Sequence, residues 1–151
     1  PSSTSGGPMT ADPAAVRRLA QLLREQAGDI RAEADRLVAL TAAAGWQGRA
    51  GEALQARVRD RGAALRRSAA RHDDAAVALD RHAAVVEERL ELLLATQRRV
   101  GELLDAAGAL AGGLPDLVER FVPPPPGDPG WLGVDVDALA RALDGWAGSA
   151  A

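Results

Sequence analysis

The stretch GWQGRAGEAL, residues 45–54, separates two long helical patterns and decides how they are arranged. Gly45 and Gly48 allow the backbone conformations of a tight helix–helix turn. Such a turn folds the flanking helices back on each other, so the sequence predicts an all-α fold, an antiparallel helical hairpin with a long second helix. Trp46, one of only three tryptophans, is expected to pack across the open end of the hairpin with its indole N–H near solvent.

The pattern before the turn predicts a first helix over residues 13–44, preceded by a flexible leader over residues 1–11. Asp12 is a favourable N-cap, and Pro13 suits the first helical position because proline has no N–H to leave unpaired. Apolar or small residues then recur at alternating intervals of four and three, the heptad spacing of a helix packed along its length. They are Val16, Ala20, Leu23, Ala27, Ile30, Ala34, Leu37, Thr41 and Ala44.

The pattern after the turn predicts one continuous helix over residues 51–111, ended by Gly112 and Gly113. One heptad set contains Val58, Leu65, His72, Leu79, Val86, Leu93, Val100 and Ala107. Its companion set contains Gly62, Ala69, Ala76, Ala83, Leu90, Gln97, Leu104 and Ala111. We expect the helix-pairing interface at Val58, Leu65, Leu79, Val86, Leu90, Leu93, Val100 and Leu104.

The second helix is longer than the first and leaves an apolar overhang. At about 1.5 Å per residue, the first helix covers the second only to about Ala83. If the aliphatic side chains of residues 84–111 stayed exposed, the protein would lose on the order of 10 kcal/mol of the stabilisation that their burial contributes. The overhang is therefore covered by the C-terminal segment or by another chain. The alternative is that the helix breaks near Gly101 or residues 71–76 and folds back.

Residues 114–151 have a different character from the hairpin over residues 12–113. Residues 114–122 predict one or two helical turns with Leu117, Val118 and Phe121 on the apolar side. Pro123–Pro126 predict an extended, semi-rigid spacer. Residues 134–148 predict a short amphipathic helix, capped by Asp135 or Asp137 and ended by Gly148. Its apolar face contains Val136, Leu139, Ala140, Leu143 and Trp146.

The amino-acid composition excludes or disfavours several classes of function. Hydrophobic residues make up 47% and aromatic residues 3%, which is typical of helix bundles, and a net charge of −3 argues against nucleic-acid binding. Every basic residue is Arg, as in GC-rich genomes such as those of actinobacteria. The arginines over residues 57–71 are read as a solvated face that attracts an acidic stretch of a partner. The chain has no Cys, and its apolar run over residues 90–95 is too short to span a bilayer.

The residues offer little for catalysis. His72 and His82 are ten positions apart and point to different sides of a helix, so they cannot share a metal ion. No glycine-rich phosphate loop follows a strand. We therefore expect no enzymatic activity, cofactor, metal or small-molecule substrate.

Trp46-Gln47-Gly48, at the turn of a heptad hairpin with Ala50, Ala53 and Leu54 following, resembles the WXG-motif (ESX-type) proteins of type VII secretion. The resemblance covers about residues 12–95. It implies hairpins that pair, as homo- or heterodimers, into four-helix bundles. It also implies export from a cytoplasmic pool, in the folded state and without a cleaved signal peptide, by a membrane ATPase. Trp46, Gln47 and Gly48 would then be the feature read by the partner or the machine, the partner being a second copy or another WXG-type protein.

The chain departs from the family in two respects. The family's Tyr-x-x-x-Asp/Glu export signal is absent because the chain has no Tyr, and the nearest substitute is Trp131 with Asp135. This suggests that a partner carries the signal. The chain is also longer than the compact family type, and similar hairpins form N-terminal targeting domains of larger secreted toxins. The alternative is a cytoplasmic, non-secreted coiled-coil adaptor in which Trp46 is only a lid.

Overall fold

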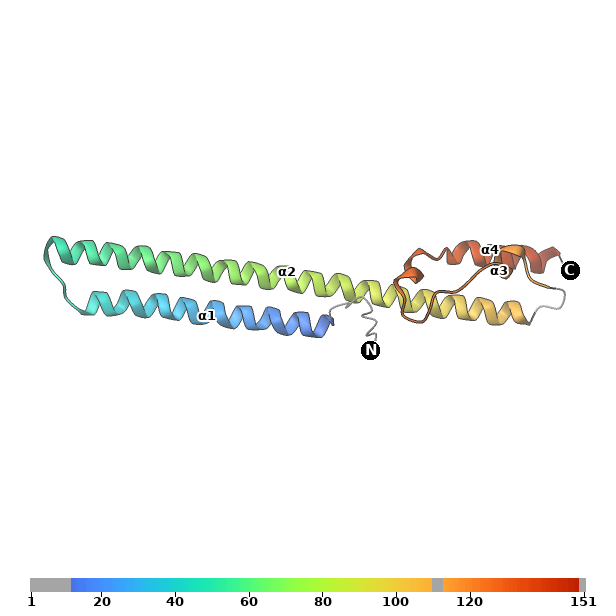
Figure 1. Ribbon diagram of the computed structural model, residues 1–151, viewed down its shortest axis with the longest axis horizontal. Helices are drawn as coiled ribbons and strands as arrows, with labels where there is room; N and C mark the ends of the chain where they lie inside the picture. Colours follow the sequence, from blue (N-terminus) through green and yellow to red (C-terminus); the bar gives the residue numbers. More distant parts are fainter. Residues whose placement is uncertain (1–11, 110–112, 150–151) are drawn as a thin grey trace, which may run out of the picture. The chain divides into compact units, whose positions relative to one another are not determined.

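A computed structural model describes residues 12–109 and 113–149, and it is helical without strands over these residues (Figure 1). The elements are α1 (Pro13–Ala43), α2 (Gly48–Gly108), α3 (Asp116–Glu119), the 3₁₀ helix η1 (Pro129–Gly133) and α4 (Val136–Ser149). The chain forms two compact units, Pro1–Val85 and Val86–Ala151, and α2 contributes to both. The predicted all-α hairpin fold is confirmed, whereas the predicted leader over residues 1–11 lies outside the described residues.

The first unit is an antiparallel hairpin in which α1 lies beside the first part of α2 (Figure 1). The Asp12 carboxylate accepts from the N–H of Ala14 at 3.1 Å, so the N-cap acts as predicted. The helices meet along a seam of small, buried residues. The seam consists of Val16, Ala20, Ala27 and Ala34 from α1 and Gly62, Ala69, Ala76 and Ala83 from α2. Small side chains let the two backbones approach closely, and a Cβ atom on Gly62 would lie 3.1 Å from Cγ2 of Val38.

Ion pairs line one side of this seam. Arg24 pairs with Asp80 and Arg31 with Asp73, each at 2.5 Å. Each of these four residues follows a seam alanine by four positions, which rotates it by about 40° around its helix. All four therefore lie on the same side of the hairpin, which we call the charged flank.

Larger side chains line the other side. They follow a seam residue by three positions or, in the case of Val58, precede one by four, which rotates them by about 40–60° in the opposite direction. We call this side the apolar flank; it contains Leu23, Ile30 and Leu37 of α1 and Val58, Leu65 and Leu79 of α2, all half-buried. The half-buried His72 lies in the same row of α2. The hairpin therefore buries its small residues and leaves its larger ones partly open to solvent.

The boundaries of α2 differ from the prediction, whereas the helix is continuous as predicted. The helix begins at Gly48, not residue 51, because Gly45 and Gly48 adopt φ values of +63° and +82° and complete the turn within a few residues. It ends at Gly108, where glycine is a weak helix former, and residues 110–112 lie outside the described chain. The alternative of a break near Gly101 or residues 71–76 is wrong, since α2 runs through both places.

The second unit covers the end of α2 with the C-terminal segment, one of the alternatives predicted for the overhang. In Figure 1, α4 lies alongside the last turns of α2. The buried core joins residues of α2 to residues of α3, η1 and α4. It consists of Leu93, Val100 and Ala107 with Val118, Trp131, Leu139 and Leu143. Within this unit, the chain itself buries Leu93, Val100 and Ala107 of α2, whereas Leu90, Leu92 and Leu94 stay exposed.

The proline segment, predicted as an extended, semi-rigid spacer, makes hydrogen bonds with α2 and with Trp131. The side-chain oxygen of Gln97 on α2 accepts from the N–H of Gly127 at 3.2 Å. The indole N–H of Trp131 donates to the carbonyl oxygen of Pro125 at 2.9 Å. These contacts make residues 123–127 a docked segment, which we call the proline strap. The physical reason is Trp131, because a buried indole N–H needs an acceptor and an extended strap has free carbonyl groups.

The tail helices follow the prediction only in part. Asp135 caps α4, because its side chain accepts from the N–H of Ala138 at 2.9 Å. α4 extends to Ser149, one residue beyond the predicted end at Gly148. In α3, Val118 is buried but Leu117 is 49% exposed, because so short a helix turns only one of the two toward the core.

Candidate functional site

The Trp-x-Gly turn presents its aromatic ring to solvent. Trp46 lies at the end of the hairpin and is 54% exposed. A ring packed across this end of the hairpin, as predicted, would therefore be only partly covered, with about half of the residue open to solvent. The backbone and Cβ of Trp46 lie close to Gly51 of α2.

Gly51 makes this arrangement of the turn feasible. A Cβ atom at Gly51 would lie 2.8 Å from the carbonyl carbon of Trp46, closer than Cβ atoms normally approach, and a tight 3.1 Å from the Trp46 Cβ. The amide of Gln55 then donates to the carbonyl oxygen of Trp46 at 3.3 Å. Sequence reasoning did not single out either residue. The available signal was a glycine inside a helical pattern, which often marks a close backbone approach.

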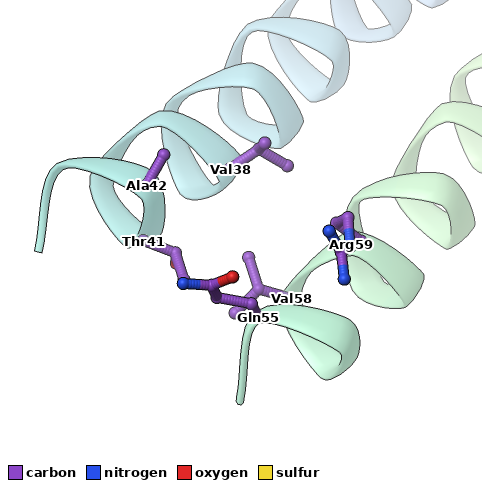
Figure 2. Close-up of a pocket in the computed structure, with 6 residues that line it drawn as sticks. All are labelled: Val38, Thr41, Ala42, Gln55, Val58 and Arg59. Atoms are coloured by element: carbon purple, nitrogen blue, oxygen red, sulfur yellow. The ribbon is translucent and has the colours of Figure 1, made fainter. Parts of the chain in front are cut away.

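A cleft lies beside the turn, between the end of α1 and the start of α2. Its volume is about 260 Å³, and it is lined by Val38, Thr41, Ala42, Gln55, Val58 and Arg59 (Figure 2). The hydroxyl of Thr41 is occupied, since it donates to the carbonyl oxygen of Leu37 at 3.0 Å. The cleft therefore offers two valine side chains, an amide and a guanidinium group.

The same end of the hairpin is strongly basic. Six exposed arginines, which we call the basic tip, belong to the first part of α2: Arg49, Arg57, Arg59, Arg61, Arg67 and Arg71. None of the six makes an ion pair or side-chain hydrogen bond with another residue of the described ranges 12–109 and 113–149. Arg66, by contrast, pairs with Asp35 of α1 at 2.6 Å. The basic tip is thus a region of unpaired positive charge that surrounds α2, because Arg59 and Arg61, two positions apart, point to opposite sides of the helix.

The predicted helix-pairing residues fall into two groups. Val58, Leu65 and Leu79 belong to the apolar flank of the first unit, where they are half-buried. In the second unit Leu93 and Val100 are buried at 4% and 0% exposure, so their prediction as an interface with another chain is corrected. The C-terminal segment covers them instead. Val86 and Leu104 are half-buried, and Leu90 is exposed.

The candidate tail signal is also used within the chain. Trp131 is 4% exposed and anchors the core of the second unit. Asp135 caps α4 rather than standing free beside it. The two residues therefore do not form the exposed element that a recognition signal requires.

The histidines lie in ordinary helical surroundings. Nδ1 of His72 lies 2.8 Å from the carbonyl oxygen of Ser68, one turn earlier on α2, and His82 is exposed. Within residues 12–109 and 113–149, no group of three or more His, Cys, Asp or Glu side chains is placed to hold a metal ion. In the same part of the chain, no helix combines the length and apolar character needed to cross a bilayer.

Comparisons of the chain with protein-family models, with curated proteins and with solved structures find no match.

Proposed function

We propose that the chain acts through helical pairing in type VII (ESX-type) secretion, as a substrate, a substrate's partner or an N-terminal targeting module. Trp46, Gln47 and Gly48 would be the element that a partner or the membrane secretion ATPase recognises. The observation that carries the proposal is the exposed Trp46 ring at the turn of an antiparallel hairpin. Tryptophan is among the residues most often central to recognition surfaces, and leaving it exposed in a free protein is unfavourable.

The apolar flank supports pairing. Its six aliphatic side chains are only half-buried, so complete burial against a second hairpin would contribute about 1 kcal/mol for each of them. Two hairpins that join along such flanks form a four-helix bundle. The second hairpin is either another copy of this chain or a second Trp-x-Gly protein. The absence of Tyr from the sequence favours a partner that carries the export signal.

The export experiment uses the tagged full chain in a bacterium that carries a type VII machine. We expect the chain in the culture filtrate, and only in the cell pellet after deletion of the membrane ATPase. Trp46→Leu should retain its helical content by circular dichroism but remain in the pellet. Trp146→Leu is the matched control, because Trp146 is also partly exposed but lies on α4.

Two outcomes contradict the proposal. Export of Trp46→Leu at the level of the unsubstituted chain would show that the ring is not recognised. Retention of every form in the pellet, with pairing intact, would instead favour the alternative of a non-secreted coiled-coil adaptor.

A further inference from the structure

We propose that the basic tip of one copy binds an acidic ridge on α2 of a second copy. The acidic ridge consists of Glu88, Glu91 and Leu92; Glu91 and Leu92 lie three and four residues after Glu88, so both are its neighbours on the same side of α2. This contact goes beyond the proposed function, which rests on Trp46 and the apolar flank.

The basic tip carries an energetic cost in the isolated chain. Residues 49–71 contain seven arginines and only two acidic residues, Glu52 and Asp60. No acidic residue lies in the first turn of α2, where the helix dipole favours negative charge and disfavours a cation such as Arg49. Because six of the arginines have no ionic partner in the described chain, this repulsion is not relieved internally. An anion from another molecule would relieve it.

The chain itself carries the negative charge that complements the basic tip. Residues 86–151 contain eleven acidic and five basic side chains, a net charge of −6 within a whole-chain charge of −3. Glu88 and Glu91 are exposed and make no ion pair with another residue of the described part of the chain. A second copy therefore supplies carboxylates that its own fold leaves unpaired.

The basic tip and the acidic ridge also have an apolar component each. Leu92 of the acidic ridge is 57% exposed. At the basic tip, Val38 and Val58 line the cleft next to the Arg59 guanidinium, and Trp46 is exposed nearby at the turn. Carboxylates beside a leucine match the Arg59 guanidinium group beside an apolar cleft. Nucleic acid matches this surface poorly, since Trp46 is the only aromatic residue among residues 1–85 and bases need stacking partners.

The contact joins two different surfaces. Two copies related by a two-fold axis make it twice in one isologous interface and close as a dimer, whereas a heterologous, head-to-tail arrangement forms rings or open chains. Because exposed charges carry most of the attraction, it weakens as the Debye length falls from about 30 Å at 0.01 M salt to about 3 Å at 1 M. Pairing along the apolar flank would not show this salt dependence.

The test measures the solution mass of the purified full chain by analytical ultracentrifugation at 0.02 M and 0.5 M NaCl. We expect self-association at low salt that weakens at least tenfold at high salt. Arg59→Glu with Arg61→Glu should abolish the salt-dependent part. Arg18→Glu with Arg81→Glu is the matched control, because these exposed arginines of the same unit change the net charge equally. The control should associate like the unsubstituted chain.

A charge-swap mixture identifies the partner surface. Glu88→Arg with Glu91→Arg should fail to self-associate at low salt, but should associate when mixed with the Arg59→Glu, Arg61→Glu variant. Four results would overturn the proposal: a monomer at both salt concentrations, salt-independent association, equal loss in the control variant, or no rescue in the mixture. Tighter binding of the basic tip to duplex DNA than to a second copy would overturn it as well.

Discussion

Replacing Trp131 should release the C-terminal segment from α2 without opening the hairpin. The side chain is 4% exposed and donates to the Pro125 carbonyl at 2.9 Å. Truncation of a buried tryptophan to alanine costs about 3–5 kcal/mol. Trp131→Phe keeps most of the ring but loses the N–H donor, so it should cost about 1–2 kcal/mol. Because a tenfold change in an opening equilibrium corresponds to about 1.4 kcal/mol, these losses are large enough to be measured locally.

Hydrogen–deuterium exchange with peptide-level mass spectrometry measures this opening. In Trp131→Ala, exchange of α4 should accelerate by about 10²–10³-fold, whereas Trp131→Phe should give about tenfold. Exchange of α1 should not change, since α1 belongs to the other compact unit. Trp146→Ala is the control, because Trp146 is 38% exposed and its removal should have little effect on the strap.

Two results would refute the reasoning about Trp131. Unchanged exchange of α4 in Trp131→Ala would mean that the tryptophan does not hold the segment on α2. Equal acceleration in Trp131→Phe and Trp131→Ala would mean that the hydrogen bond, rather than burial of the ring, supplies the stabilisation.

Two further predictions concern the hairpin and are checked by urea denaturation followed by circular dichroism. Ala76→Leu places a large side chain in the close seam and should destabilise the hairpin by about 1–3 kcal/mol. Ala75→Leu, on the exposed side of the helix, should change stability by less than about 0.5 kcal/mol. Equal effects of the two substitutions would contradict a close-packed seam. Gly51→Ala should destabilise the hairpin by about 1–2 kcal/mol because the added Cβ meets the Trp46 carbonyl group. At Gly28 an added Cβ has open space, so Gly28→Ala should stabilise the hairpin by up to about 1 kcal/mol. A stabilising effect of Gly51→Ala would contradict the close approach.

Heptad spacing and the turn residues were sufficient to predict the helices and their antiparallel order. They could not predict which of the two heptad sets of α2 is buried. In the first unit the set containing Ala69 and Ala76 is buried, whereas in the second unit the other set, with Leu93 and Val100, is buried. Periodicity identifies faces that are suited to packing, but the neighbouring segment decides which face it contacts. A close helix selects small residues, and an irregular tail accommodates large ones.

The candidate site was predicted in its position but not in its details. The Trp-x-Gly turn was recognised from its residue types, whereas the exposure of Trp46 depends on how its backbone packs against Gly51. The role of Trp131 was missed because its acceptor, Pro125, lies in a segment whose composition predicts only extension. Proline-rich composition restricts the local backbone, but it does not show whether another element lies alongside.

The proline strap also affects the unfolded chain. Each proline limits the backbone conformations available before folding, which typically favours the ordered state by about 0.4–1 kcal/mol per residue. Four consecutive prolines, Pro123–Pro126, therefore reduce the free-energy cost of the conformational entropy lost on docking by about 2–4 kcal/mol. This helps to explain how a segment tied down by the Gln97 and Trp131 hydrogen bonds can remain ordered against α2. Much of its order is present in the covalent structure before any contact forms.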